Sequence, residues 1–174
     1  ASQTVTVNDN EAPVVTPTAN VSVPTATGLC TASVAITDAV AADNCSVAGI
    51  SYVMSGATVK ASTSGQVGTY TFNRGVTTIT YTVTDGSGNT SSGSMTVTVN
   101  DQQVPVITAP TAVSVNAGTG TCQAINVAIG TPVTSDNCSV ASVTNDHVST
   151  TYPLGTTTVV WTVTDGSGNT ATAS

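Results

Sequence analysis

Positive charge is almost absent from this sequence. Its 174 residues include two Lys plus Arg side chains against nine Asp plus Glu, which sets the formal net charge at −7 at pH 7. Nucleic acids and anionic membrane surfaces are bound through clusters of basic residues. The composition therefore argues against both as partners, and it leaves the acidic side chains with few cations to neutralise them.

Aromatic residues, histidine and long apolar runs are also scarce. No stretch approaches the ~20 apolar residues of a membrane-spanning helix, so we expect no direct membrane insertion. The single histidine, His147, cannot serve a repeated chain twice, and its surroundings contain no nucleophile elbow. Every carboxylate falls in a predicted turn or linker rather than across a cleft. We therefore expect no enzymatic activity.

What the chain does have is an internal duplication. The stretch 77–90 (TTITYTVTDGSGNT) returns at 157–170 as TTVVWTVTDGSGNT, and 43–48 (DNCSVA) returns unchanged at 136–141. A repeat of this length is typical of a whole small domain rather than a solenoid turn. The sequence thus predicts two tandem domains.

The strand signal within the duplicated stretch has a period of two. Ile79, Tyr81 and Val83 alternate with threonines, and Val159 and Trp161 occupy the matching inward positions of the second copy. Alternation of this kind indicates sheets with one buried face, and no segment shows a helical period. Short strands separated by turn signals predict an all-β chain of two immunoglobulin-like antiparallel β-sandwiches.

The two copies differ in length after the second cysteine of each. From Cys45 to Phe72 there are 27 positions, whereas from Cys138 to Tyr152 there are 14. The first domain therefore carries an insertion near residues 52–70. Its ends look like strands, which favours an extra hairpin over a flexible binding loop.

The two ends of the sequence give the remaining boundaries. Ser2–Val7 matches Ser94–Val99, so we interpret residues 1–8 as the last strand of a preceding repeat. The first domain is then 9–101, and the second is 102–174 without its own last strand. Two interpretations remain: a segment of a longer array, which we favour, or a strand supplied by another molecule through strand addition.

Each copy contains two cysteines at matching places. A regular pair in each small β domain is typical of disulfides formed in an oxidising compartment. A zinc site fits less well because there is no Cys-x-x-Cys motif. We therefore predict the disulfides Cys30–Cys45 and Cys122–Cys138.

The acidic residues suggest a metal site at the entrance of each domain. In an immunoglobulin-type sandwich, the loop before the last strand lies near the point where the chain enters. Carboxylate and amide oxygens clustered there suit calcium, which takes six to eight oxygen ligands. The alternative is that these side chains only stabilise turns. The candidate ligands are Asn8, Asp9, Asp43, Asp85 and Asn89 in the first domain, and Asn100, Asp101, Asp136, Asp165 and Asn169 in the second.

Taken together, these motifs resemble the hyalin repeat (HYR) domain. The resemblance rests on Asp-Asn-Cys, on an aromatic-x-x-Gly element at Phe72–Gly75 and Tyr152–Gly155, and on Thr-Val-Thr-Asp-Gly-Ser-Gly-Asn, and it covers residues 12–174. It implies an extracellular, cell-surface, immunoglobulin-like adhesion module. Tandem copies with this Thr and Val bias are similar to the stalks of large bacterial adhesins. The chain departs from the animal pattern in having only two cysteines per repeat.

Three functions follow as hypotheses. The first is a stalk segment, whose partners are neighbouring repeats of the same chain or like subunits. The second is a module that binds a glycan or a surface protein itself. The third is a filament subunit that donates its N-terminal strand. A binding module should expose an aromatic cluster, so the burial of Tyr52 and Tyr70 discriminates between the first two.

Overall fold

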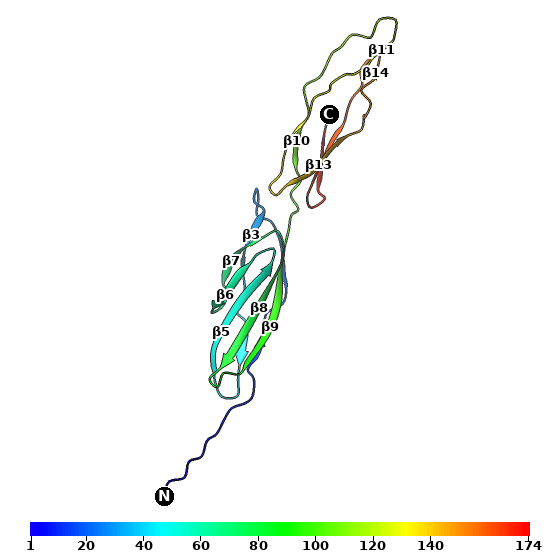
Figure 1. The fold of residues 1–174 in the computed structure, drawn as a ribbon. Helices are drawn as coiled ribbons and strands as arrows, with labels where there is room; N and C mark the ends of the chain where they lie inside the picture. Colours follow the sequence, from blue (N-terminus) through cyan, green and yellow to red (C-terminus); the bar gives the residue numbers. More distant parts are fainter. The chain divides into compact units, whose positions relative to one another are not determined.

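The structure is a computed structural model that describes residues 1–174, and it contains strands but no helix (Figure 1). No segment forms a helix with the length and hydropathy needed to cross a membrane. The all-β class predicted from the sequence is confirmed. The chain divides into two compact units, Ala1–Ala26 with Cys30–Asn100 and Thr27–Leu29 with Asp101–Ser174.

The first unit contains nine strands. They are β1 (Val14–Thr16), β2 (Val21–Pro24), β3 (Thr31–Ala35), β4 (Val40–Ala42), β5 (Val47–Gly56), β6 (Lys60–Ser64), β7 (Thr69–Asn73), β8 (Gly75–Asp85) and β9 (Thr90–Asn100). Five of them form one sheet in the order β2-β9-β8-β5-β6, and the pairs β3-β7 and β1-β4 form separate ladders. The buried side chains of these ladders and of the large sheet make one hydrophobic cluster, as in a sandwich.

One pairing departs from the predicted antiparallel arrangement. β2 runs parallel to β9, with Val21 opposite Val97 and Val23 opposite Val99, whereas the other pairs are antiparallel. Pro17 separates β1 from β2, and proline interrupts a continuous ladder. The first edge is therefore split: β1 pairs with β4, and β2 pairs with β9 in the large sheet.

The core of the first unit follows the alternation seen in the sequence. Ile79, Tyr81 and Val83 on β8 are fully buried, and Met95 and Val97 on β9 lie beside them. The Tyr81 ring centroid lies 6.3 Å from that of Tyr52 on β5. A thin core of β-branched residues is therefore completed by a few large side chains at its centre.

The insertion forms the expected hairpin. β5 and β6 pair antiparallel across the connection at 57–59, and β6 is the edge strand of the large sheet. Tyr52 is buried, Tyr70 is half-buried against the core, and Lys60 Nζ lies 4.9 Å from the centroid of the Tyr70 ring. The insertion thus extends the sheet and leaves no exposed aromatic cluster.

The second unit has shorter strands. They are β10 (Val106–Thr108), β11 (Gln123–Ala124), β12 (Val133–Ser135), β13 (Val140–Asn145), β14 (Tyr152–Pro153), β15 (Trp161–Asp165) and β16 (Thr170–Ala173). β13, β15 and β16 form its largest sheet, on which Trp161 and Val163 are buried. β16 has four residues where β9 has eleven. Residues 1–8 form no strand and are exposed.

The predicted disulfides Cys30–Cys45 and Cys122–Cys138 are wrong, because Cys45 and Cys122 are free thiols. Cys30 and Cys138 are each disulfide-bonded. In the first unit the Cys30 carbonyl accepts a hydrogen bond from Arg74 N, beside the start of β8, whereas the residue after Cys45 contacts Gly86 beyond its end. An eleven-residue strand spans about 34 Å, and a disulfide needs Cα atoms within about 7 Å.

The second unit separates its cysteines in the same way. The Cys122 carbonyl accepts a hydrogen bond from Leu154 N, which lies before β15. Cys138 precedes Ser139, whose carbonyl accepts a hydrogen bond from Gly166 N just after β15. Matching positions in two copies therefore predicted pairs within each copy, but the chain between the two cysteines runs from one end of its unit to the other.

Candidate metal centre

Asp85 is placed by the turn that joins β8 to β9. Its Oδ1 accepts hydrogen bonds from Ser87 N (2.9 Å) and Asn89 N (2.8 Å), and its Oδ2 accepts one from Asn89 Nδ2 (2.7 Å). The glycines of the Asp-Gly-Ser-Gly-Asn loop allow this tight geometry, since Gly88 has a φ of 92°. The sequence therefore folds locally around a carboxylate that is only 2% exposed.

Two opposing effects act on the pKa of Asp85. Burial raises this pKa, whereas the hydrogen bonds from the Asn89 side chain and from the backbone of Asn89, Ser87 and Gly88 lower it. The hydrogen bonds prevail, so the pKa lies below its ordinary value and Asp85 is a carboxylate at neutral pH. A charged, largely buried oxygen pair thus stands at the end of β8.

Asp43 follows β4 and stabilises the next turn. Its Oδ2 accepts hydrogen bonds from Cys45 N and Ser46 N, both at 2.9 Å. Its Oδ1 is buried and has no hydrogen-bond partner. One oxygen of Asp43 therefore holds the loop, and the other is left for a different partner.

Asp9 lies where the chain enters the first unit. Asn89 Nδ2 donates to the Asp9 carbonyl at 3.3 Å, so the β8–β9 turn holds the entering chain directly. Asp9 Oδ1 accepts hydrogen bonds from Glu11 N (3.1 Å) and Asn44 Nδ2 (3.4 Å), whereas Oδ2 is buried without a partner. The entrance is thereby tied to both loops that carry the other two aspartates.

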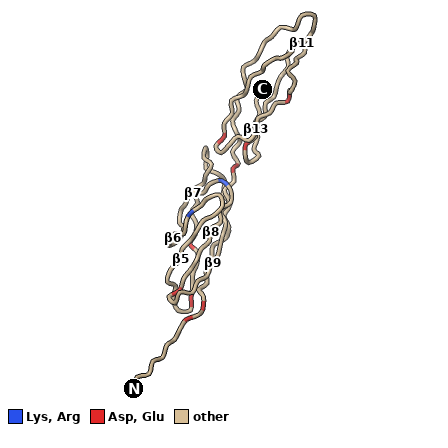
Figure 2. The backbone as a smooth tube through the Cα atoms, in the orientation of Figure 1, with Lys and Arg blue, Asp and Glu red and all other residues tan.

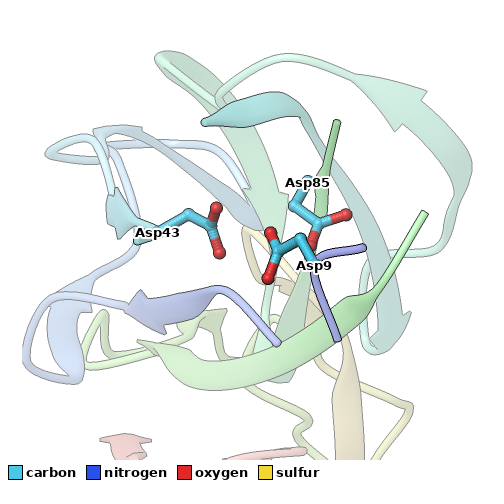
Figure 3. A group of neighbouring side chains, drawn as sticks. All are labelled: Asp9, Asp43 and Asp85. Carbon is cyan, nitrogen blue, oxygen red and sulfur yellow. The ribbon is translucent and has the colours of Figure 1, made fainter. Parts of the chain in front are cut away.

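The three carboxylates converge, and Figure 3 shows them facing one another. Asp9, Asp43 and Asp85 each offer an oxygen, and these oxygens all lie within 4.8 Å of one another. Neither basic residue is at this end of the unit: Lys60 lies over the ring of Tyr70, and Arg74 precedes β8 while Asp85 ends it (Figure 2). Negative charge is thus concentrated without a cationic side chain to offset it.

A neighbouring thiol responds to this concentration of charge. The hydrogen bond to Asp9 and the negative charge of Asp9, followed by smaller effects that include Asp43 and Asp85, raise the pKa of Cys45. Cys45 was not among the residues predicted to lie at this site. Its position two residues after Asp43 is the signal that could have found it.

The second unit repeats the arrangement. Oxygens of Asp101, Asp136 and Asp165 also lie within 4.8 Å of one another. Asp165 accepts from Ser167 N, Asn169 N and Asn169 Nδ2 as Asp85 does from its own turn, and the same opposition of burial and hydrogen bonds lowers its pKa. Asn169 Nδ2 also donates to the Asp101 carbonyl at 3.2 Å. The duplicated motif therefore builds the same cluster twice.

The two clusters differ in how many oxygens already have partners. Asp101 Oδ1 accepts from Gln103 N and from Asn137 Nδ2, both at 3.2 Å, and Oδ2 accepts from Ser167 Oγ at 3.4 Å. Only Asp136 Oδ1 is buried without a partner there, whereas the first cluster has two such atoms. The first cluster is consequently the better candidate for a cation.

Four of the ten predicted ligands, the asparagines, either position the aspartates or lie away from the two clusters. The amides of Asn89 and Asn169 donate to aspartate oxygens and so position the clusters. Asn100 Nδ2 donates to Ser22 Oγ at 2.9 Å, and Asn8 is exposed. The six aspartates are the residues that the structure brings together. Hard carboxylate oxygens of this kind suit calcium, and backbone carbonyls or water complete such sites.

Comparison with known proteins agrees with the fold and with the hyalin-like motifs. The family model described as a bacterial Ig domain matches residues 8–98. Hyalin of Strongylocentrotus purpuratus is 32% identical over 173 residues, which cover 97% of this chain. The chain spans 14% of the length of that relative.

Proposed function

Because this chain belongs to the bacterial Ig domain family, we propose that it is a structural segment of an extracellular cell-surface adhesion protein, in the manner of an adhesin stalk built from hyalin-type repeats. The observation that carries this proposal is that each unit holds the chain at the point where the chain enters it. In the first unit, Asn89 holds the Asp9 carbonyl and the Asp9 carboxylate meets those of Asp43 and Asp85. A segment that transmits force needs a defined entry of the chain into each unit.

The burial of the aromatic residues supports a structural role over ligand binding. Tyr52, Phe72, Tyr81 and Trp161 are buried, and Tyr70 packs against the core. A site for a glycan or a protein usually presents an exposed apolar or aromatic patch. The insertion that was the best candidate for such a site instead extends the sheet as β6.

This role is tested on intact cells that produce the full protein. An antibody raised against residues 1–174 should label the cell surface, and the purified chain should bind neither a glycan array nor host-cell surface proteins. Specific glycan binding that is lost when Tyr70 is replaced by alanine would replace the stalk with a binding module. Absence of surface labelling would contradict the extracellular assignment.

We further propose that calcium occupies the entrance clusters and stiffens them. The two buried oxygens without partners, Asp9 Oδ2 and Asp43 Oδ1, support this because a bound cation would satisfy both. No basic side chain competes for them. Calcium bound only by the folded state stabilises it by mass action, by about 2.7 kcal/mol at one hundred times the Kd.

The calcium site is tested by isothermal titration calorimetry and by melting with excess calcium or excess chelator. We expect heat of binding and a Tm several degrees higher in calcium. Asp43→Asn keeps an oxygen for the Cys45 and Ser46 amides but removes the negative charge. It should abolish calcium binding to the first cluster, which we expect to be the tighter of the two sites. Asp38→Asn removes the same charge from an exposed residue outside the cluster and should leave binding unchanged. An identical Tm in calcium and chelator would contradict the proposal.

A further inference from the structure

Each unit contains one peptide bond of a chemically labile kind. Asp-Gly occurs at Asp85–Gly86 and at Asp165–Gly166, no other aspartate precedes a glycine, and the sequence contains no Asn-Gly. In Asp-Gly the nitrogen of the glycine can attack the side-chain carboxyl of the aspartate, because glycine has no Cβ to hinder the approach. The attack leads to isoaspartate. Both bonds of this kind lie in the turns that join β8 to β9 and β15 to β16.

The conversion needs only water as a co-reactant. In the first step the Gly86 nitrogen forms a bond to Asp85 Cγ, and the amide proton and a carboxyl hydroxyl leave as one water molecule, which closes a succinimide ring. Water then adds to the backbone carbonyl carbon of Asp85, and the bond from that carbon to the Gly86 nitrogen breaks. The chain now continues through Cγ, and the former carbonyl carbon carries a free carboxylate. The main chain is thereby lengthened by one carbon atom.

The folded turn of the first unit restrains both reacting groups. Gly86 N donates a hydrogen bond to Ser46 O at 3.1 Å, which holds the amide that would attack. The carboxylate of Asp85 accepts three hydrogen bonds, one from Ser87 N and two from Asn89. Ring closure requires the amide and the side chain to rotate into an attacking geometry, so these hydrogen bonds have to break first.

The second unit repeats the restraint with the same groups. Gly166 N donates to Ser139 O at 2.9 Å, and the Asp165 carboxylate accepts from Ser167 N (2.8 Å), Asn169 N (2.8 Å) and Asn169 Nδ2 (2.7 Å). In both turns the two glycines and the serine between them are exposed, whereas the aspartate is buried. Water therefore reaches both turns, and the barrier to conversion is the fixed geometry of the reacting groups.

We propose that Asp85 and Asp165 are sites of isoaspartate formation, which the intact turns suppress and which local opening of a turn permits. The Asp85 oxygen lies within 4.8 Å of those of Asp9 and Asp43 (Figure 3). An added main-chain carbon moves this carboxylate, so each conversion permanently removes one member of an entrance cluster. The amount of isoaspartate in a turn therefore records how often that turn has opened.

The experiment follows isoaspartate at each site in the full chain, kept in warm neutral buffer with excess chelator. Mass spectrometry with electron-transfer fragmentation distinguishes isoaspartate from aspartate, and a peptide of residues 83–90 is the unrestrained reference. Conversion in the folded chain should be at least about 100-fold slower than in the peptide. Asn89→Ala removes a donor to the Asp85 carboxylate and should speed conversion there about tenfold. Asp165 in the same molecules should keep its rate, and Asn169→Ala should reverse the pattern.

A control variant separates opening of the turn from general loss of stability. Gly56→Ala places a Cβ 2.4 Å from Val76 O and destabilises the first unit, but Gly56 pairs with Thr77 at the opposite end of β8 from Asp85. It should leave the rate at Asp85 unchanged while the unit stays folded.

Three outcomes would overturn the proposal: conversion in the folded chain as fast as in the peptide, no acceleration in Asn89→Ala, or equal acceleration in Gly56→Ala. Chelator is present throughout, so the result does not depend on calcium binding. A failed calcium titration or absent surface labelling would contradict the proposed function and leave this inference standing.

Discussion

At the scale of one residue, Tyr81 places a polar hydroxyl in the core without a hydrogen-bond partner. Its side chain is 0% exposed, and its hydroxyl has no hydrogen-bond partner. Burial, with smaller effects from the charges of Asp38 and Tyr52, raises the pKa of this hydroxyl. A buried hydroxyl without a partner costs about 1–3 kcal/mol. The ring therefore stabilises the core, while the hydroxyl detracts from it.

The substitution Tyr81→Phe should for this reason stabilise the protein. We expect a gain of about 1 kcal/mol in the free energy of unfolding, measured by urea denaturation. Tyr70→Phe, at a half-buried ring, is the matched control and should change stability little. A loss of stability in Tyr81→Phe would mean that its hydroxyl has a partner in solution, such as a buried water.

The cysteines lead to a second prediction at this scale. In native, unreduced protein, iodoacetamide should modify Cys45 and Cys122 and leave Cys30 and Cys138 unmodified. Peptide mass spectrometry before and after reduction identifies the modified residues. Recovery of a peptide cross-linked through Cys30 and Cys45 would restore the pairing within one repeat that the sequence suggested.

The β5–β6 hairpin shows how an element is attached to the sheet. Thr58 in its connection donates its backbone N–H to Thr77 Oγ1 (3.0 Å) and accepts from Asn73 N (2.9 Å), and Ala57 N donates to Val76 O. These bonds draw the connection against β8. The close approach requires glycine at position 56, where φ is +95° and an added Cβ would lie 2.4 Å from Val76 O.

Gly56→Ala should therefore destabilise the first unit by about 3 kcal/mol, from backbone strain and from steric overlap with Val76 O. Gly65→Ala separates the two effects. Gly65 has a φ of +96° but open space around its Cβ position, so we expect a loss of about 1 kcal/mol. Equal losses in the two variants, measured by thermal or urea unfolding, would show that the hairpin moves away from β8 without penalty.

At the scale of the whole molecule, the Asp-Gly-Ser-Gly-Asn turn occurs in both units and governs how the stability of each unit changes in acid. Hydrogen bonds outweigh burial and lower the pKa values of Asp85 and Asp165 below the ordinary value of 3.8. A carboxyl with a lowered native pKa binds protons less readily when folded. Its stabilising effect is complete above the unfolded pKa and disappears as the pH falls through the lower, native pKa.

In excess chelator, the Tm should accordingly decrease as the pH is lowered from about 5 through 3.8 and further. Asn89→Ala combined with Asn169→Ala removes the side-chain hydrogen bonds to both carboxylates. This double variant should be less stable at neutral pH and should lose less on acidification. A Tm that rises on acidification would contradict the lowered pKa values.

Local patterns in the sequence were sufficient to predict the strands, the hairpin insertion and the approach of the aspartates. Alternation with a period of two determines which face of β8 is buried, and the Asp-Gly-Ser-Gly-Asn spacing determines a turn that closes on its own carboxylate. These features depend on residues that are close together in the chain or that recur at a fixed spacing. They are therefore visible without a structure.

Other features depend on where distant segments meet, and only the tertiary structure decided them. The cysteines of each copy lie at opposite ends of their unit because the connecting chain runs along its length. The parallel pairing of β2 with β9 follows from the split edge at Pro17. Which aspartate oxygens keep a free lone pair depends on Asn44, Asn137 and Ser167, whose contacts no local pattern specifies.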